Sequence, residues 1–188
     1  IGGQQCRAIV QSIEAPDFQL ASMLLDAARK RSLQVTHRNM QALYFRAWRR
    51  DVVRTIESGR DYDVLGSHRD LSRITSRTPD AEWSVALPAT PDFRSHVTFV
   101  TPALDRPGLY TIAASARQDF GSGENRILAA TLILSDLVLV SRPRPTGLEV
   151  AVTLGATGAP VPGAEAVVYR LDWQKGHKRL ATRTTDAA

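Results

Sequence analysis

The chain has 188 residues, enough for one full domain and part of another, with 43% hydrophobic and 23% charged side chains as in an ordinary folded protein. No apolar run approaches the roughly 18 residues that cross a bilayer, which excludes a membrane-spanning helix. The net charge is +5, and all but three of the 24 basic residues are arginines. These arginines are dispersed along the chain instead of forming one patch, so we expect no nucleic-acid partner.

The two ends predict an internal fragment, or a mature chain whose targeting segment is missing. The first residue is Ile1, and no signal peptide follows it. Residues 185–188 read as the approach to a turn with no strand after it. A hairpin that never returns would leave the edge of its partner strand unpaired, so we expect the last domain to be incomplete.

A short amphipathic helix is predicted over residues 4–14, and Pro16 ends it. Its apolar stripe consists of Cys6, Ile9, Val10 and Ile13. Such a helix needs a surface to dock on, so we expect the tail of a preceding helical region, with Cys6 buried as a small apolar residue and not a reactive thiol. Because Cys6 is the only cysteine, an internal disulfide is excluded, although export is not.

The next segments carry weaker signals. Over residues 17–30 one set of apolar residues has helical spacing and another alternates as in a strand. Residues 33–38 alternate cleanly and predict a strand. Residues 43–56 begin as an aromatic-rich strand, which we favour, although the stretch also fits a helix. Residues 57–80 are polar and read as a connection with at most one short turn, around 71–74.

Further along, apolar alternation and turn clusters predict a series of short strands. Strands are expected at 83–87, 97–101, 109–116 and 127–134, with turns at 88–92, 102–108 and 121–125. This regular spacing is typical of a sandwich or barrel. Pro143 and Pro145 then form a stiff break that suits a domain border near 136–147. Another set of strands follows, at 148–154, at 167–171 and from Leu180.

Residues 157–164 read Thr-Gly-Ala-Pro-Val-Pro-Gly-Ala, and Val167-Val168-Tyr169 and Thr184-Thr185-Asp186 follow them. This set resembles the loop, strand and turn pattern of macroglobulin-like domains in bacterial alpha-2-macroglobulin-like proteins. Other stretches resemble the domain before it in large bacterial members of that family. They are His37-Arg38-Asn39 with residues 44–48, and residues 107–115 closed by Ser135-Asp136-Leu137. The resemblance covers roughly residues 33–188.

The resemblance implies a mostly β fold of Ig-like or macroglobulin-like antiparallel β-sandwich domains in tandem, with a short N-terminal helix. We expect residues 1–16 to be the helical tail of a preceding region, residues 17–136 one macroglobulin-like sandwich, and residues 137–188 a second, truncated one. The implied parent is an exported protease inhibitor, located in the periplasm, in the cell envelope or outside the cell. It traps its target proteases by a conformational change.

Within such a parent, this segment would be a non-catalytic scaffold that contacts neighbouring domains of the same chain and makes no membrane contact. Some family members carry a Cys-x-Glu-Gln thioester, and Cys6 does not match that motif because Glu-Gln does not follow it. The alternatives are a structural or adhesive Ig-like module of a bacterial surface protein and, more weakly, an accessory domain of an enzyme.

The side chains that invite a chemical reading do not form a recognisable motif. His37, His68, His96 and His177 lie far apart and lack the close spacing of metal ligands, so surface or half-buried histidines are expected. Ser95, His96 and Asp92 suggest a hydrolase, but a strand sends neighbouring side chains to opposite faces, and no Gly-x-Ser-x-Gly motif is present.

The remaining candidates read as structural. The loop Gly121-Ser122-Gly123 precedes a strand and not a helix, which argues against a phosphate site. We expect Trp48 and Trp83 in the core and Trp173 partly exposed. The sequence therefore predicts no catalytic, cofactor-binding or metal-binding residue, no cofactor and no enzymatic activity.

Overall fold

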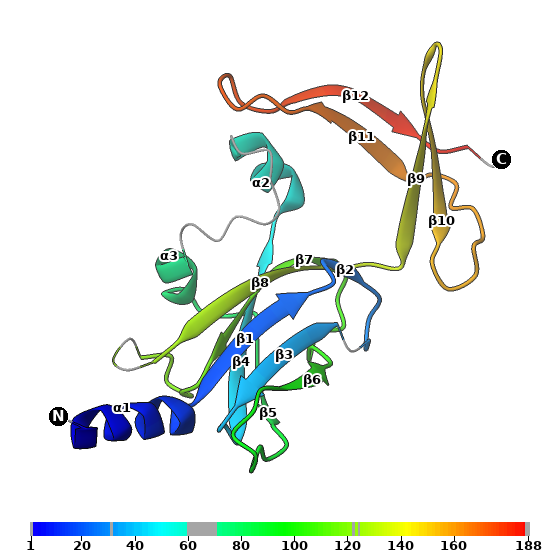
Figure 1. The fold of residues 1–188 in the computed structure, drawn as a ribbon. Coiled ribbons are helices and arrows are strands. Elements are labelled where there is room, and N and C mark those ends of the chain that lie inside the picture. Colours follow the sequence, from blue (N-terminus) through cyan, green and yellow to red (C-terminus); the bar gives the residue numbers. More distant parts are fainter. Residues whose placement is uncertain (1, 31, 60–70, 122, 124, 187–188) are drawn as a thin grey trace.

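A computed structural model describes residues 2–30, 32–59, 71–121, 123 and 125–186 (Figure 1). The fold is mostly β, with short helices at the N-terminus and between two of the strands. The helices are α1 (Gly2–Glu14), α2 (Val52–Ser58) and α3 (Leu71–Thr75). None of the described helices is long and apolar enough to cross a membrane.

The first sheet is antiparallel and has the order β1-β3-β6, with β1 at Asp17–Ser22, β3 at Leu33–Arg38 and β6 at His96–Val100. Burial alternates along β3, where Leu33, Val35 and His37 face inward. This period of two is the pattern that the sequence shows, and it fixes the register because a slip by one residue would turn these side chains to solvent.

The second sheet has the order β2-β8-β7-β4-β5 and is antiparallel except for the short pairing of β2 with β8. Its strands are β2 (Leu25–Asp26), β4 (Ala42–Arg50), β5 (Ala81–Ala86), β7 (Gly108–Ser115) and β8 (Ile127–Leu134). In the central strand β7 seven consecutive residues are buried. Both faces of the sheet are therefore covered at β7.

The inner face of the second sheet packs on the first sheet and forms the hydrophobic core. Phe18 and Val35 come from the first sheet, and Phe45, Ile112 and Leu132 from the second. Phe45 stacks on Trp83 with the ring centroids 5.2 Å apart. Two sheets that enclose one apolar layer make a β-sandwich, as the alternating strands predict.

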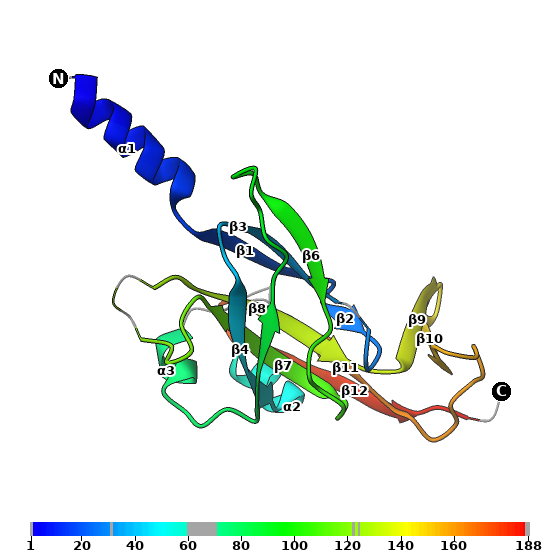
Figure 2. The same ribbon diagram turned by 90° about the horizontal axis from the view of Figure 1, so that it is seen from below.

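Helices α2 and α3 lie in the connection between β4 and β5 (Figure 2), and the residues just after α3 contact the outer face of the second sheet. Trp48 points to this face because it is three residues from the inward-facing Phe45. Its side chain is 2% exposed, and the indole N–H donates to the carbonyl of Arg77, 3.1 Å away. The described residues between α3 and β5 thus hydrogen-bond to the outer face of the sheet.

Two hairpins follow the sandwich, β9 (Leu137–Arg144) with β10 (Gly147–Leu154) and β11 (Glu165–Arg170) with β12 (Lys178–Thr184). Neither hairpin shares a ladder with the two sandwich sheets. The loop between them joins them: the Val161 N–H donates to the Val152 carbonyl, and the Thr185 hydroxyl donates to the Val161 carbonyl. The Pro-Val-x-Gly stretch therefore holds one hairpin against the other.

One alternative left open by the sequence is decided, and two expectations need correction. Residues 17–22 form a strand, so the alternation there prevails over the helical spacing. Residues 52–58 form a helix directly after β4, because Asp51 caps it by accepting a hydrogen bond from the Arg54 N–H. The stiff break expected from Pro143 and Pro145 is instead mostly strand: β9 runs from Leu137 through Pro143, which an edge strand tolerates.

Cys6 also differs from its prediction, since it is exposed. Helix α1 forms as expected but contacts the sandwich only near its C-terminal end, where the Asn39 side-chain amide donates to the Ile13 carbonyl. Ile9 and Val10 remain 59% and 49% exposed. The apolar stripe that would bury Cys6 therefore has no partner among the described residues.

Candidate functional site

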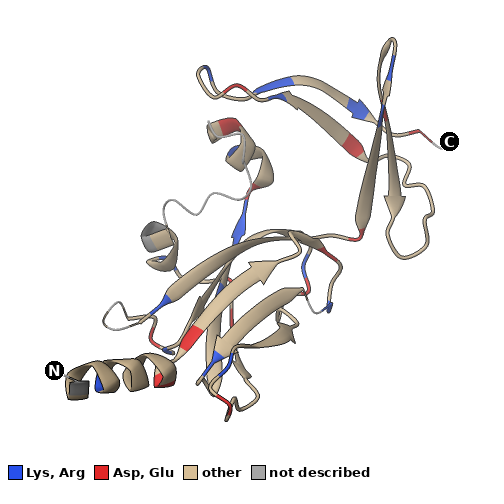
Figure 3. Ribbon diagram, in the orientation of Figure 1, with Lys and Arg blue, Asp and Glu red and all other residues tan. Residues whose placement is uncertain are grey.

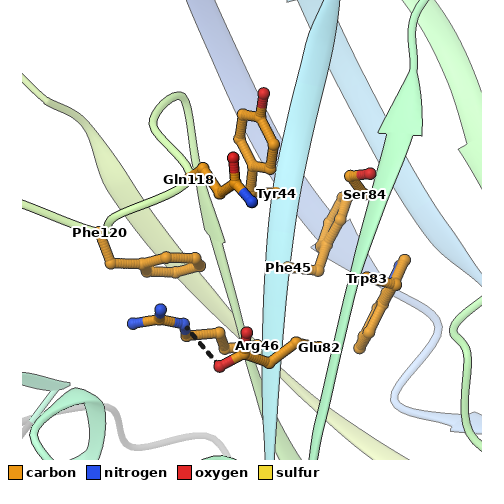
Figure 4. A pocket seen from close by; sticks show the side chains of 8 residues that line it. All are labelled: Tyr44, Phe45, Arg46, Glu82, Trp83, Ser84, Gln118 and Phe120. Carbon is orange, nitrogen blue, oxygen red and sulfur yellow. Dashed lines mark ion pairs between the residues drawn. The ribbon is translucent and has the colours of Figure 1, made fainter.

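A hollow on the described surface opens beside the strands β4 and β5 of the second sheet (Figure 4). Strands β4 and β5 form its floor, and the connection from β7 to β8 forms its wall. Its volume is about 220 Å³. The lining residues are Tyr44, Phe45, Arg46, Glu82, Trp83, Ser84, Gln118 and Phe120.

Charge pairing and ring contacts fill much of this hollow. Arg46 and Glu82 are opposite each other in β4 and β5, and their side chains form an ion pair with 3.2 Å between Nε and Oε1. The Arg46 guanidinium carbon also lies 4.3 Å from the centre of the Phe120 ring, a cation–π contact. Arg46 is therefore engaged on two sides and is not presented to a ligand.

The wall of the hollow is ordered by its own ion pair. Arg117 donates from Nε and an Nη atom to the two carboxylate oxygens of Asp119. These hydrogen bonds, together with one from the Gly121 N–H, lower the pKa of Asp119 to about 2. Asn125 closes the same loop by donating to the Gly121 carbonyl and to Ser115.

The lining residues do not supply a catalytic set. Ser84 is the lining residue closest in type to a nucleophile, but no histidine lies among the lining residues to activate it. The charged lining residues, Arg46 and Glu82, neutralise each other. Aromatic side chains beside a paired arginine suit packing against another surface, so the hollow can act as a contact site but offers no evident chemistry.

The suspected hydrolase residues come together only in part. The His96 ring nitrogen Nε2 lies 2.9 Å from Asp92 Oδ1, and this hydrogen bond is the main reason that the pKa of Asp92 is lowered. Both side chains are nearly half exposed. The hydrogen bonds among the described residues do not include one between Ser95 and His96, so the nucleophile of a triad is not engaged.

The histidines do not gather around a common centre in the described part of the chain. No group of three or more His, Cys, Asp or Glu side chains there could hold a metal ion. His68 lies outside the described residues. His37 and His177 are 1% and 6% exposed, which corrects the expectation of surface or half-buried rings. His37 is buried because it continues the inward-facing row of Leu33 and Val35.

The buried His37 makes stability pH-dependent. Burial lowers the pKa of His37 below its ordinary value of 6.5, and the nearby His96 lowers it further. The folded state therefore resists protonation of His37. The contribution of the neutral ring to the free energy of unfolding is fully present above pH 6.5, and it is lost as the pH falls from 6.5 toward the lowered pKa. We expect urea midpoints to fall between about pH 7 and pH 5, and to fall less in His37→Gln, which keeps a group able to bond Thr98. Equal slopes in both proteins would contradict this assignment.

The other residues singled out from the sequence have structural positions. Trp83 packs against the core and Trp173 is 57% exposed in the turn between β11 and β12, both as predicted. Trp48 is buried as expected, but on the face of the sheet opposite the core in which it was predicted. Gly121 and Gly123 lie in the connection between β7 and β8, where a hairpin loop was expected. The charged residues are spread over the described elements (Figure 3).

Sequence reasoning missed two groups of polar contacts. One is the Arg46–Glu82 pair, which a cross-strand register between β4 and β5 would have suggested. The other joins Glu57 of α2 to Tyr169 and Arg179 of the last hairpin. Nothing in the spacing of residues more than a hundred positions apart signals that second contact.

Comparison with known proteins places the fold. No family model and no curated protein matches the chain. A crystal structure of native alpha-2-macroglobulin from Escherichia coli spanning domains NIE-MG1 matches 93% of this chain and 84% of its own, with a TM-score of 0.69 and 15% identity. One spanning domains MG0-NIE-MG1 matches 90% of this chain with a TM-score of 0.63 and 14% identity, and the chain spans about half of its length, 55%. The chain therefore has a macroglobulin-like β-sandwich fold, similar to that of the NIE-MG1 segment of Escherichia coli alpha-2-macroglobulin.

Proposed function

We propose that this chain is a non-catalytic scaffold segment of an exported alpha-2-macroglobulin-like protease inhibitor. The observation that carries the proposal is the extent of the structural likeness, which runs over 93% of the chain and so includes both the sandwich and the hairpins after it. A lone Ig-like sandwich would match over one domain only. The proteins matched are multidomain chains, which supports neighbouring domains of the same chain as partners.

The proposed domain division follows from hydrogen bonding and exposure. All strands up to Leu134 belong to the two sandwich sheets, and those from Leu137 belong to the hairpins. Every residue of β9 is exposed, including the apolar run 137–140, and Leu148 in the paired strand β10 is 52% exposed. We infer that residues 137–188 are part of a second sandwich whose remaining strands cover this apolar surface.

Protease trapping is tested on the full-length parent protein. The parent is incubated with a broad-specificity protease, and the residual cleavage of a large protein substrate is compared with that of a small peptide. If the parent encloses the protease, cleavage of the protein substrate is lost while the peptide is still cut. Heat-denatured parent serves as the control for simple competition by added protein.

Equal cleavage of both substrates, with the parent left intact, would overturn the trapping proposal. The chain would then be a structural or adhesive module of a surface protein. Fractionation of the source cells tests the location separately, and we expect the parent in the periplasm, in the cell envelope or outside the cell.

A further inference from the structure

Helix α2 lies between the sandwich and the last hairpin (Figure 1). It begins directly after β4, where the Asp51 carboxylate accepts a hydrogen bond from the Arg54 N–H, 2.9 Å away, and the Asp51 carbonyl accepts one from Thr55. These bonds fix the start of the helix to the end of a sandwich strand. Its other end reaches the hairpin β11–β12, which belongs to the region after residue 136.

The contact is centred on one carboxylate oxygen. Oε1 of Glu57 accepts a hydrogen bond from the Tyr169 hydroxyl at 3.2 Å and another from Arg179 Nη2 at 2.9 Å. Tyr169 and Arg179 are paired in register across β11 and β12, next to a β-bulge, and the guanidinium lies over the phenol ring. The hairpin itself therefore holds the two donors side by side, independently of Glu57.

A second contact lies two residues further along, at Gly59, which caps the end of α2. A Cβ atom placed on Gly59 would lie 3.6 Å from Cδ2 of His177, so the backbone of Gly59 runs close to the His177 ring. His177 is almost fully buried, and its Nδ1 accepts a hydrogen bond from the Asp172 N–H within the hairpin turn. Asp172 also accepts from the N–H groups of Gln174 and Lys175. The helix end thus meets an ordered turn.

We propose that α2, through the contacts at its C-terminal end, sets the orientation of the hairpin β11–β12 relative to the sandwich. The described strands after residue 136 share no ladder with the sandwich sheets, so their orientation is not fixed by backbone pairing. Glu57 and Arg179 are each nearly half exposed, and ion pairs of this kind are weak and screened by salt. The contact of α2 with the hairpin therefore favours one orientation of the hairpin but is easily broken. This inference stands whether or not the parent traps proteases.

Spin-label distances test the proposal. In a Cys6→Ser background, labels are placed at Gln19→Cys on β1 and at Arg183→Cys on β12, both exposed positions. The distance distribution between them should be narrow with Glu57 present. In Glu57→Ala we expect the distance distribution to broaden and lose its single peak. The labelled protein that keeps Glu57 should show the same broadening at about 1 M salt, where the screening length is near 3 Å.

Two further variants separate a loss of orientation from a general loss of structure. Glu149→Ala removes an equally exposed carboxylate whose partner, Arg144, lies in its own hairpin, and it should leave the distribution narrow. The exchange Glu57→Arg with Arg179→Glu restores the ion pair and should restore the peak. An unchanged distribution in Glu57→Ala would overturn the proposal. So would equal broadening in Glu149→Ala, or no recovery in the exchanged pair.

Discussion

Replacing Phe45 with alanine should lower the free energy of unfolding by about 3–5 kcal/mol. Phe45 is 1% exposed and stacks on Trp83 at 5.2 Å with an interplanar angle of 5°. It lies in β4, between β5 and β7, so the two neighbouring strands limit how far the cavity can collapse. A loss of this size is a large part of the roughly 5–15 kcal/mol that holds a typical domain folded.

The matched control for Phe45 is Phe99→Ala, the same chemical change at a position that is 52% exposed on the edge strand β6. Its effect should stay within about 0.5 kcal/mol, as for surface substitutions in general. Urea unfolding followed by far-UV circular dichroism measures both variants. Similar losses for the two would mean that the inner faces of the sheets have been assigned wrongly.

The sandwich could be predicted because its strands display their buried face in the sequence. Leu33, Val35 and His37 alternate with polar residues, and the same positions are buried in β3. The alternation of Trp83 and Val85 likewise marks the side of β5 that faces inward. Where one face of a strand meets the core and the other meets water, the period of two is visible without any knowledge of the partner strand.

The predictions that failed depend on interactions that the pattern of a segment does not show when the segment is read alone. Cys6 is exposed because the surface that would cover α1 is not among the described residues, and no pattern within the helix can reveal its partner. The prolines near residue 143 suggest a break when read alone, yet pairing with β10 keeps that segment extended. The helix α2 was hidden because its short sequence continues the apolar pattern of β4.

The polar contacts were even harder to predict from the sequence. Arg46 and Glu82 meet only once β4 and β5 are paired in register, and Phe120 arrives from a third segment. Glu57 and Arg179 are separated by 122 positions. A single sequence identifies such side chains only as charged surface residues, because what distinguishes them is the geometry that brings them together.

Trp48→Ala should also cost about 3–5 kcal/mol, although Trp48 lies on the face of the sheet opposite the core. The indole is 2% exposed, and it donates to the Arg77 carbonyl in the segment between α3 and β5. Trp48→Phe keeps most of the buried area but loses that hydrogen bond, and we expect a loss of about 1 kcal/mol. Trp173→Ala, at a side chain that is 57% exposed, is the matched control and should change little.

Amide hydrogen exchange would show which part of the fold loses stability in Trp48→Ala. The connection is held at its far end by Asp80, whose carboxylate accepts from the Arg49 N–H at 2.7 Å and whose own N–H donates to the Ala47 carbonyl. Removing the indole should therefore speed exchange in α3 and around Arg77 while β1, β3 and β6 stay protected. Uniform acceleration across the chain would mean that the connection is an integral part of the sandwich core. Confined acceleration would mean that it is a separable third layer, able to move with α2 while both sheets remain intact.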